Sequence, residues 1–179
     1  DIVPALVCVT AVTAITIARY LHHDFQHRRL YDAGTDLPNR RAFAQRQNIG
    51  EERLTIAMLV ENYEALRAIF GDSGSDVLIQ RLAERLAEQN PGVQIYRVKE
   101  RILAWTVSAP GYEPEFELGK LVKILRTPLH VEARAVDAIT TFGVASSDAL
   151  NEAIHAAHRA ATEERSLVFH ADAEQENME

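Results

Sequence analysis

The side chains that could do chemistry in this sequence are scattered along the chain. Glu100 lies between Lys99 and Arg101 in a short polar link that joins two apolar runs. Its carboxylate could serve as a metal ligand, or it could form a local charge pair on an exposed hairpin. Exposed pairs of this kind contribute about 0 to 1 kcal/mol. We favour the charge pair over the metal ligand.

The histidines and the cysteine do not form a recognisable metal motif. His155 and His158 are three residues apart and could share one face of a helix, while three more crowd the N-terminal segment: His22, His23 and His27. Zinc sites in proteins use three or four ligands. Cys8 lies in an apolar run, where a small hydrophobic role is favoured. We therefore expect solvated histidines, no metal and no cofactor.

Composition limits the classes of partner. The chain has 179 residues, 47% of them hydrophobic, and a formal net charge of −7. A broad nucleic-acid-binding face needs clustered lysine and arginine to contact phosphates. Such a face is not expected, and no nucleic-acid partner is predicted.

The N-terminal segment has the composition of a membrane anchor. From Ile2 to Ala18 every residue is apolar, Thr or Pro, and a spanning helix needs about 17 to 25 residues. Arg19 and further bases follow directly, as on the cytoplasmic flank of a spanning helix. A packed soluble helix is the alternative, and a signal peptide fits poorly because the bases follow the run. We expect residues 1–18 to be the end of a transmembrane helix and 19–33 a helical stalk.

The hydrophobic pattern of the remaining chain mixes helices and strands. A turn at 35–40 starts a helix that ends at Gly50, and a strand is predicted at 53–60. Helices are predicted at 61–70, after a break at 71–75, and at 116–125 and 149–162. Strands are predicted at 93–96, 102–107, 130–134, 138–145 and 167–170. This order predicts an α+β fold, a mixed central sheet flanked by helices, over residues 34–170.

Several motifs resemble those of GGDEF, or diguanylate cyclase, domains. The stretch from Asp32 to Phe43, D-A-G-T-D-L-P-N-R-R-A-F, is similar to the opening motif of that family, with departures at Gly34 and Asp36. Further matching anchors follow in register: Tyr63, Phe70-Gly71, Ser75-Asp76, Tyr96-Arg97, Ile139 to Ala145, and Ala153 to Arg165. The resemblance implies a nucleotidyl-cyclase-like sheet over about residues 31 to 170.

The same resemblance implies that the catalytic positions have been replaced. The family's five signature positions read Lys99, Glu100, Arg101, Ile102 and Leu103, with Arg101 at the acidic metal-binding position. The family's other metal-binding Asp corresponds to Leu59, its base-recognising Asn to Arg67 and its phosphate-contacting Lys to Ala161. Asp76 and Arg165 match the family, whereas Asn90 and Val93 replace its product-inhibition motif. Magnesium prefers carboxylate oxygens, so we expect no catalytic and no metal site.

These observations predict a catalytically inactive regulatory or dimerisation domain in cyclic di-GMP signalling. It would form a homodimer through the N-terminal helix and relay a signal to an output domain such as an EAL phosphodiesterase, beyond a polar linker at 171–179. We expect it at the bacterial inner membrane with this domain in the cytoplasm, or otherwise in the cytoplasm. The alternatives are a GTP-binding sensor without turnover and an active diguanylate cyclase.

Overall fold

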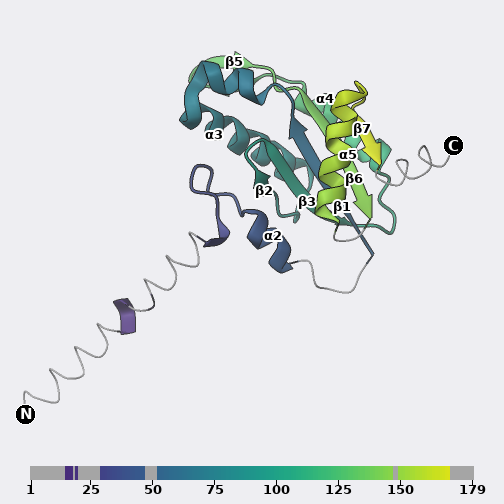
Figure 1. The fold of residues 1–179 in the computed structure, drawn as a ribbon, viewed down its shortest axis with the longest axis horizontal. Helices are drawn as coiled ribbons and strands as arrows, with labels where there is room; N and C mark the ends of the chain where they lie inside the picture. Colours follow the sequence, from purple (N-terminus) through teal and green to yellow (C-terminus); the bar gives the residue numbers. More distant parts are fainter. Residues whose placement is uncertain (1–14, 18, 20–28, 47–51, 147–148, 170–179) are drawn as a thin grey trace, which may run out of the picture.

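A five-stranded sheet in the order β2-β3-β1-β6-β7 organises the computed structural model of this chain (Figure 1). The structure describes residues 15–17, 19, 29–46, 52–146 and 149–169. The strands are β1 (Arg53–Val60), β2 (Tyr96–Lys99), β3 (Ile102–Ser108), β6 (Thr140–Ser146) and β7 (Leu167–Phe169). All neighbours pair antiparallel except β6 and β7, which are parallel. The predicted α+β class with a mixed sheet is confirmed.

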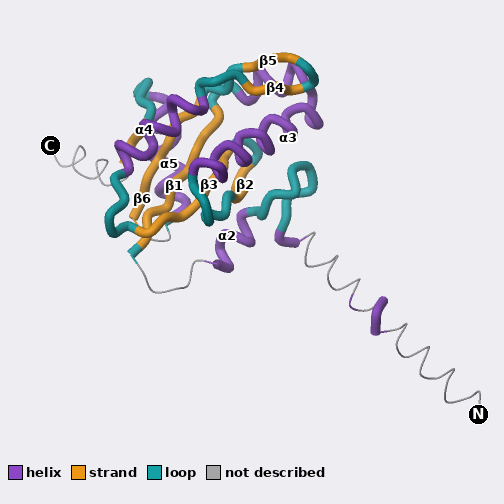
Figure 2. Tube along the Cα trace, turned by 180° about the vertical axis from the view of Figure 1, so that it is seen from behind, coloured by secondary structure: helices purple, strands orange, loops and turns teal. Residues whose placement is uncertain are grey.

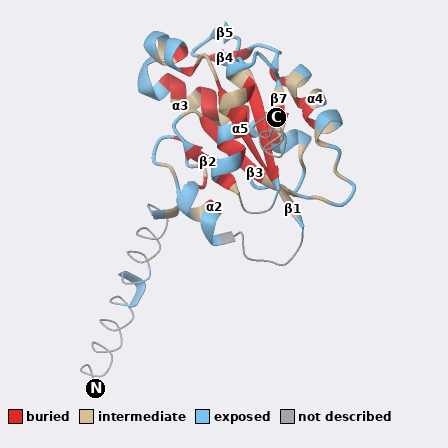
Figure 3. Ribbon diagram, turned by 45° about the vertical axis from the view of Figure 1, so that its right-hand side comes forward, coloured by how far each residue is buried: buried red, intermediate tan, exposed pale blue. Residues whose placement is uncertain are grey.

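Helices cover both faces of this sheet because the side chains of each strand alternate between them. In β1, Ile56, Met58 and Val60 pack toward α3 (Tyr63–Gln89) and α4 (Pro114–Leu125). Ala57 and Leu59 pack toward α2 (Arg40–Arg46) and α5 (Leu150–Thr162). Figure 2 shows this layering from behind, and Figure 3 shows the buried residues concentrated in the sheet and on the inner helix faces.

Three predicted boundaries were wrong, for local reasons. The expected break at 71–75 is confined to Gly71 (φ 68°, ψ −172°), after which α3 resumes, and Ser75 Oγ donates a 2.8 Å hydrogen bond to the Gly71 carbonyl. The second predicted strand begins at Tyr96 instead of residue 93, because Val93 belongs to a turn closed onto the Asn90 carbonyl. The β6 strand begins at Thr140 instead of residue 138.

The single strand predicted at 130–134 is a separate hairpin. It consists of β4 (Leu129–Val131) and β5 (Arg134–Val136), joined by Glu132 and Ala133. Both turn residues have positive φ, 47° and 63°. Glycine or asparagine usually marks such a turn, and neither is present here. The sequence therefore carried no signal for it.

The N-terminal predictions fall mostly outside the described residues. Residues 15–17, 19, 29 and 30 are helical. The remainder of the predicted anchor and stalk, including Cys8, His22, His23 and His27, lies outside the described part, as do Gly50 and the linker 171–179. Among the described helices, none is both long enough and apolar enough to cross a membrane.

Candidate functional site

A buried arginine on the edge strand β2 is the centre of the polar network. Arg97 is 7% exposed, and its Nη1 lies 2.7 Å from Asp32 Oδ1 and 2.6 Å from Asp76 Oδ1. Its Nε and Nη2 donate to the Glu100 carbonyl at 3.1 and 2.9 Å. Burial alone would lower the pKa of Arg97, but the hydrogen bonds to Asp76 and Asp32 outweigh it and raise that pKa. One guanidinium thus joins three separate segments of the chain.

The opening motif forms the acidic side of this network. Burial would raise the pKa of Asp32, but hydrogen bonds from Thr35 and Arg97 hold it below its ordinary value. Thr35 donates to Asp32 Oδ1 from both its backbone N (3.0 Å) and its Oγ1 (2.7 Å). Asp36 has a φ of 55°, which Asp tolerates better than most residues. The turn is therefore closed by Asp32 and Thr35, with Asp36 in the left-handed region.

Gly34 leaves the space that the Asp76 carboxylate occupies. A Cβ placed on Gly34 would lie 2.0 Å from Asp76 Oδ2, far inside van der Waals contact. The departure from the family motif at Gly34 is therefore linked to the position of Asp76. Asp76 is retained from the family, and in this chain its carboxylate is an ion-pair partner of Arg97.

Arg67, at the family's base-recognising position, bridges helix α3 and the hairpin between β2 and β3. Its Nε lies 2.7 Å from Asp72 Oδ1 and its Nη1 lies 2.5 Å from Glu100 Oε1. Hydrogen bonding to Asp72 and the charges of Asp72 and Glu100 raise the pKa of Arg67. Glu100 thus pairs with Arg67 across 33 residues of sequence, and not with its chain neighbours as the sequence predicted.

The hairpin itself turns without glycine. Glu100 and Arg101 connect β2 to β3, and neither has a positive φ. The pairing shifts between Arg97 and Lys99, which places an irregularity at the end of β2. The two bonds from Arg97 to the Glu100 carbonyl close this turn. They account for a tight connection in a sequence that lacks the usual turn residues.

The positions that correspond to the family's metal ligands carry no carboxylate. Leu59, at the end of β1, is 2% exposed and packs in the cluster between the sheet and α5. Arg101 is a cation, and its carbonyl accepts a 3.0 Å hydrogen bond from Val60 N. Ile102 and Leu103 are buried core residues. Within the described residues no group of three His, Cys, Asp or Glu side chains could hold a metal ion.

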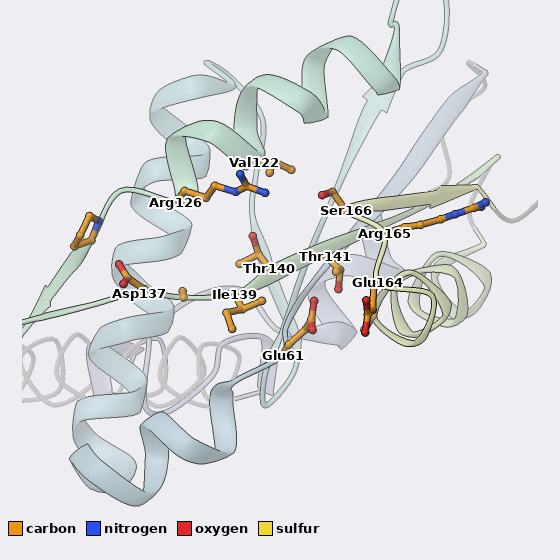
Figure 4. Close-up of a pocket in the computed structure, with 13 residues that line it drawn as sticks. Glu61, Val122, Arg126, Asp137, Ile139, Thr140, Thr141, Glu164, Arg165 and Ser166 are labelled. Carbon is orange, nitrogen blue, oxygen red and sulfur yellow. The ribbon is translucent and has the colours of Figure 1, made fainter.

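A cavity of about 580 Å³ lies where α4 ends and α5 passes into β7 (Figure 4). Ala161, at the family's phosphate-contacting position, and the retained Arg165 both line it. Figure 4 shows Arg165 directed away from Glu61 and Thr141, and Arg165 Nη1 lies 3.5 Å from Glu163 Oε2. The charged lining residues are Arg126, Arg165, Glu61, Asp137 and Glu164. Acidic side chains thus outnumber basic ones.

His155 and His158 lie on α5 (Leu150–Thr162). His155 is exposed and His158 is half-buried. Burial lowers the pKa of His158, and the charges of Arg101, Lys99 and His155 lower it further. These contributions place His158 close to the basic hairpin.

Sequence reasoning did not predict the role of Arg97. It had identified Arg97 only as an anchor of the resemblance, although an arginine within an apolar strand must find acidic partners when it is buried. Asp32 and Asp76 were both available as anchors of the same resemblance. The unusual signal was the placement of Arg97 between Tyr96 and Val98, both of which are buried.

Comparison with known proteins gives matches at the level of structure. No protein-family model and no curated sequence matches the chain. The GGDEF domain of FimX from Pseudomonas aeruginosa matches with a TM-score of 0.63 at 25% identity, over 78% of this chain and 98% of that one. A diguanylate cyclase/phosphodiesterase from Caldicellulosiruptor saccharolyticus matches with a TM-score of 0.68 at 18% identity, over 78% and 91%.

A third solved structure agrees with these two. The GGDEF domain of DgcB from Caulobacter crescentus, in complex with c-di-GMP, matches with a TM-score of 0.64 at 15% identity, over 79% of this chain and 96% of that one. In each case nearly the whole length of the known structure is covered, and the predicted mixed sheet with flanking helices is the shared feature. The chain therefore has the fold of GGDEF domains.

Proposed function

We propose that this chain is a regulatory GGDEF-type domain of cyclic di-GMP signalling that neither synthesises the dinucleotide nor binds GTP in the family's manner. The observation that carries the proposal is the pairing of Arg67 with Glu100. This contact occupies, from within the chain, the position that the resemblance assigns to base recognition. Three features of the site support it: its residues are poorly suited to bind a metal, to recognise guanine and to contact phosphates.

The residues present do not fit a divalent cation. Hard cations such as magnesium are bound by carboxylate, carbonyl and water oxygens. The two family ligand positions carry the buried alkyl group of Leu59 and the guanidinium of Arg101. Glu100 is the acidic side chain of the hairpin, and Arg67 already neutralises it. A triphosphate would therefore approach a hairpin without the metal that normally compensates its charge.

The side chains at the family's base-recognising position and at its retained Asp76 are both committed to internal contacts. Arg67 bonds Asp72 and Glu100, whereas Asp76 bonds Arg97, which is 7% exposed. Removing a carboxylate from a buried guanidinium leaves an uncompensated charge, which is strongly destabilising. Guanine would have to displace Asp76 from Arg97 to gain its hydrogen bonds. This cost argues against guanine recognition.

The family positions at Ala161 and Arg165 are also poorly suited to bind phosphate. Ala161 has no charge, and Arg165 is paired with Glu163 and points away from Glu61. The charged residues that line the neighbouring cavity comprise two bases and three acids. Like charges repel a triphosphate in a site that lacks a compensating metal. The cavity is thus poorly suited to nucleotide phosphates.

The remaining role is regulatory and depends on geometry. We infer that the domain forms a homodimer through the N-terminal helix, and that it transmits a rotation or register change of that helix to an output domain after residue 179. An EAL phosphodiesterase is the output domain that the resemblance favours. The anchoring of this protein at the bacterial inner membrane, with the domain on the cytoplasmic side, belongs to the same proposal.

A GTP-binding sensor without turnover is the second candidate. It is favoured by one observation: Asp76 and Arg165 are retained, and Arg165 lines a cavity large enough for a small ligand. In that case GTP would bind without reacting and would change the orientation of a neighbouring domain. An active cyclase with unusual ligands is the third alternative.

A product assay tests the proposal against the active alternative. Purified chain is incubated with GTP and magnesium or manganese, and nucleotides are separated by chromatography. We expect no cyclic di-GMP above the level of a no-protein control. Product that accumulates with wild-type chain and disappears with Asp76→Ala would establish an active cyclase and refute the proposal.

A further inference from the structure

A basic groove lies beside the edge strand β2, apart from the cavity next to Arg165. The groove has a volume of about 430 Å³. It is formed by the opening motif, the start of α2 and the end of β2, and α2 packs against β2 through the edge-to-face rings of Phe43 and Tyr96. Its charged and polar lining residues are Arg29, Asp32, Asn39, Arg40, Arg41, Arg97, Lys99 and Glu100.

The charges of this groove do not cancel. Its two carboxylates are already paired, Asp32 with Arg97 and Glu100 with Arg67. Arg40 donates a 2.6 Å hydrogen bond to the neutral amide of Asn151. Within the described part of the chain, Arg29, Arg41 and Lys99 take part in no ion pair. Four cationic side chains of the groove thus have no carboxylate partner among the described residues, in a protein whose formal net charge is −7. They are Arg29, Arg40, Arg41 and Lys99.

The positive potential extends beyond the groove. Burial lowers the pKa of His158, and the next contributions come from Arg101 and Lys99. His158 therefore senses the same basic hairpin from the side of α5. A concentration of one sign of charge at a concave surface attracts counter-ions and raises their local concentration. The groove therefore favours anions over cations, although the chain as a whole is acidic.

The chemistry of the lining indicates which anion fits. Guanidinium groups bind phosphate through two parallel hydrogen bonds, and a lysine adds a point charge. None of the nine described residues that line the groove is aromatic, and Val98 is its aliphatic member. A nucleobase would find no stacking surface there. We propose that this groove binds a small anion with two or more phosphate groups and is indifferent to any attached base.

Pyrophosphate is the probe for this proposal. Calorimetry on the full chain at low salt, without magnesium, should show binding that weakens as salt is added, because phosphate contacts release counter-ions. The double substitution Arg41→Gln/Lys99→Gln removes two exposed cations that join no ion pair. We expect it to weaken pyrophosphate binding by about tenfold or more.

A charge-matched variant is the control. Arg81→Gln/Lys123→Gln also removes one arginine and one lysine, from exposed positions on α3 and α4 away from the groove. It should bind pyrophosphate within about twofold of wild type. Circular dichroism of both variants confirms that each is folded before binding is compared.

The outcomes separate this inference from the proposed function. If wild-type chain binds no pyrophosphate, or if both double variants lose binding equally, the proposed binding of phosphates in the groove is refuted. The proposed function of the domain is not affected by either result. Binding that requires magnesium, prefers GTP to ATP and survives Arg41→Gln/Lys99→Gln would refute the groove and also contradict the proposed function. Equal binding of GTP and ATP triphosphates, lost with Arg41→Gln/Lys99→Gln, supports the groove.

Discussion

Arg97 Nη1 lies 2.6 Å from Asp76 Oδ1, so a carboxylate that the resemblance matches to a nucleotide-binding position of the family is held by a buried arginine of the same domain. The same nitrogen lies 2.7 Å from Asp32 Oδ1. This contact ties the opening motif, helix α3 and strand β2 to one guanidinium. It gives Asp76 a structural role in this domain.

Replacing Arg97 should destabilise the domain strongly. Arg97→Met keeps much of the side-chain volume but leaves Asp32 and Asp76 without their cation, and we expect a loss of about 3 kcal/mol in the free energy of unfolding. Urea denaturation measures it. Arg81→Met is the control, because Arg81 forms an exposed pair with Glu84, and its effect should stay within about 0.5 kcal/mol. Similar losses in the two variants would contradict the role of Arg97.

Gly34→Ala should be destabilising because its Cβ would collide with Asp76 Oδ2 at 2.0 Å. We expect a loss of about 1 to 3 kcal/mol, with a smaller effect in an Asp76→Ala background. Gly119→Ala on α4 is the matched control: its Cβ meets nothing within 4 Å, and alanine stabilises helix interiors by about 0.5 to 1 kcal/mol. A double-mutant cycle with no coupling between positions 34 and 76 would count against the link.

The stability of the domain should fall as His158 becomes protonated. The pKa of His158 is lowered in the folded state from an ordinary value of 6.5, so the unfolded chain binds the proton first as the pH falls. The stability that the neutral imidazole contributes is present above pH 6.5 and is lost as the pH falls through the lower, folded-state pKa. His158→Gln should therefore flatten the decrease in melting temperature between about pH 7.5 and 5.5. His130→Gln, on the exposed β4 position, controls for loss of a histidine, and an unchanged slope in His158→Gln would refute the prediction.

The predicted stalk dimer can be tested by substitution. Polar replacements at Tyr20, Leu21, Phe25 and Leu30 remove the apolar side chains through which two N-terminal helices would pair. We expect these variants to sediment as monomers at concentrations where wild-type chain is dimeric. Substitutions at exposed α3 positions such as Glu84 should have no such effect. Identical sedimentation of stalk variants and wild type would contradict dimerisation through this segment.

The sequence predicted the fold where burial alone determines structure. The strand at Arg53–Val60 and the helix ending at Thr162 were located correctly, because long apolar patterns leave little choice of face. Turn chemistry limited the rest: Glu132 and Ala133 adopt positive φ without glycine. The β2–β3 turn depends on Arg97 and on the Glu100 carbonyl, which no local pattern reveals.

The resemblance indicates which family positions carry other residues in this chain, but it does not predict the contacts that those residues make. The replacements at Leu59 and Arg101 follow from register alone. The pairing of Arg67 with Glu100 joins residues 33 positions apart. Such contacts depend on how α3 and the hairpin pack together, and the family pattern offers no guide because neither Arg67 nor Glu100 belongs to it.

The most direct test of the central claim is calorimetry with GTP and magnesium, with ATP as the matched nucleotide. Because Arg67 is paired with Glu100 and Asp76 with Arg97, we expect no magnesium-dependent preference of this chain for GTP. The two triphosphates should bind weakly at most, and with equal affinity. Magnesium-dependent binding of GTP in the micromolar range, well above that of ATP and abolished by Asp76→Ala, would contradict the account.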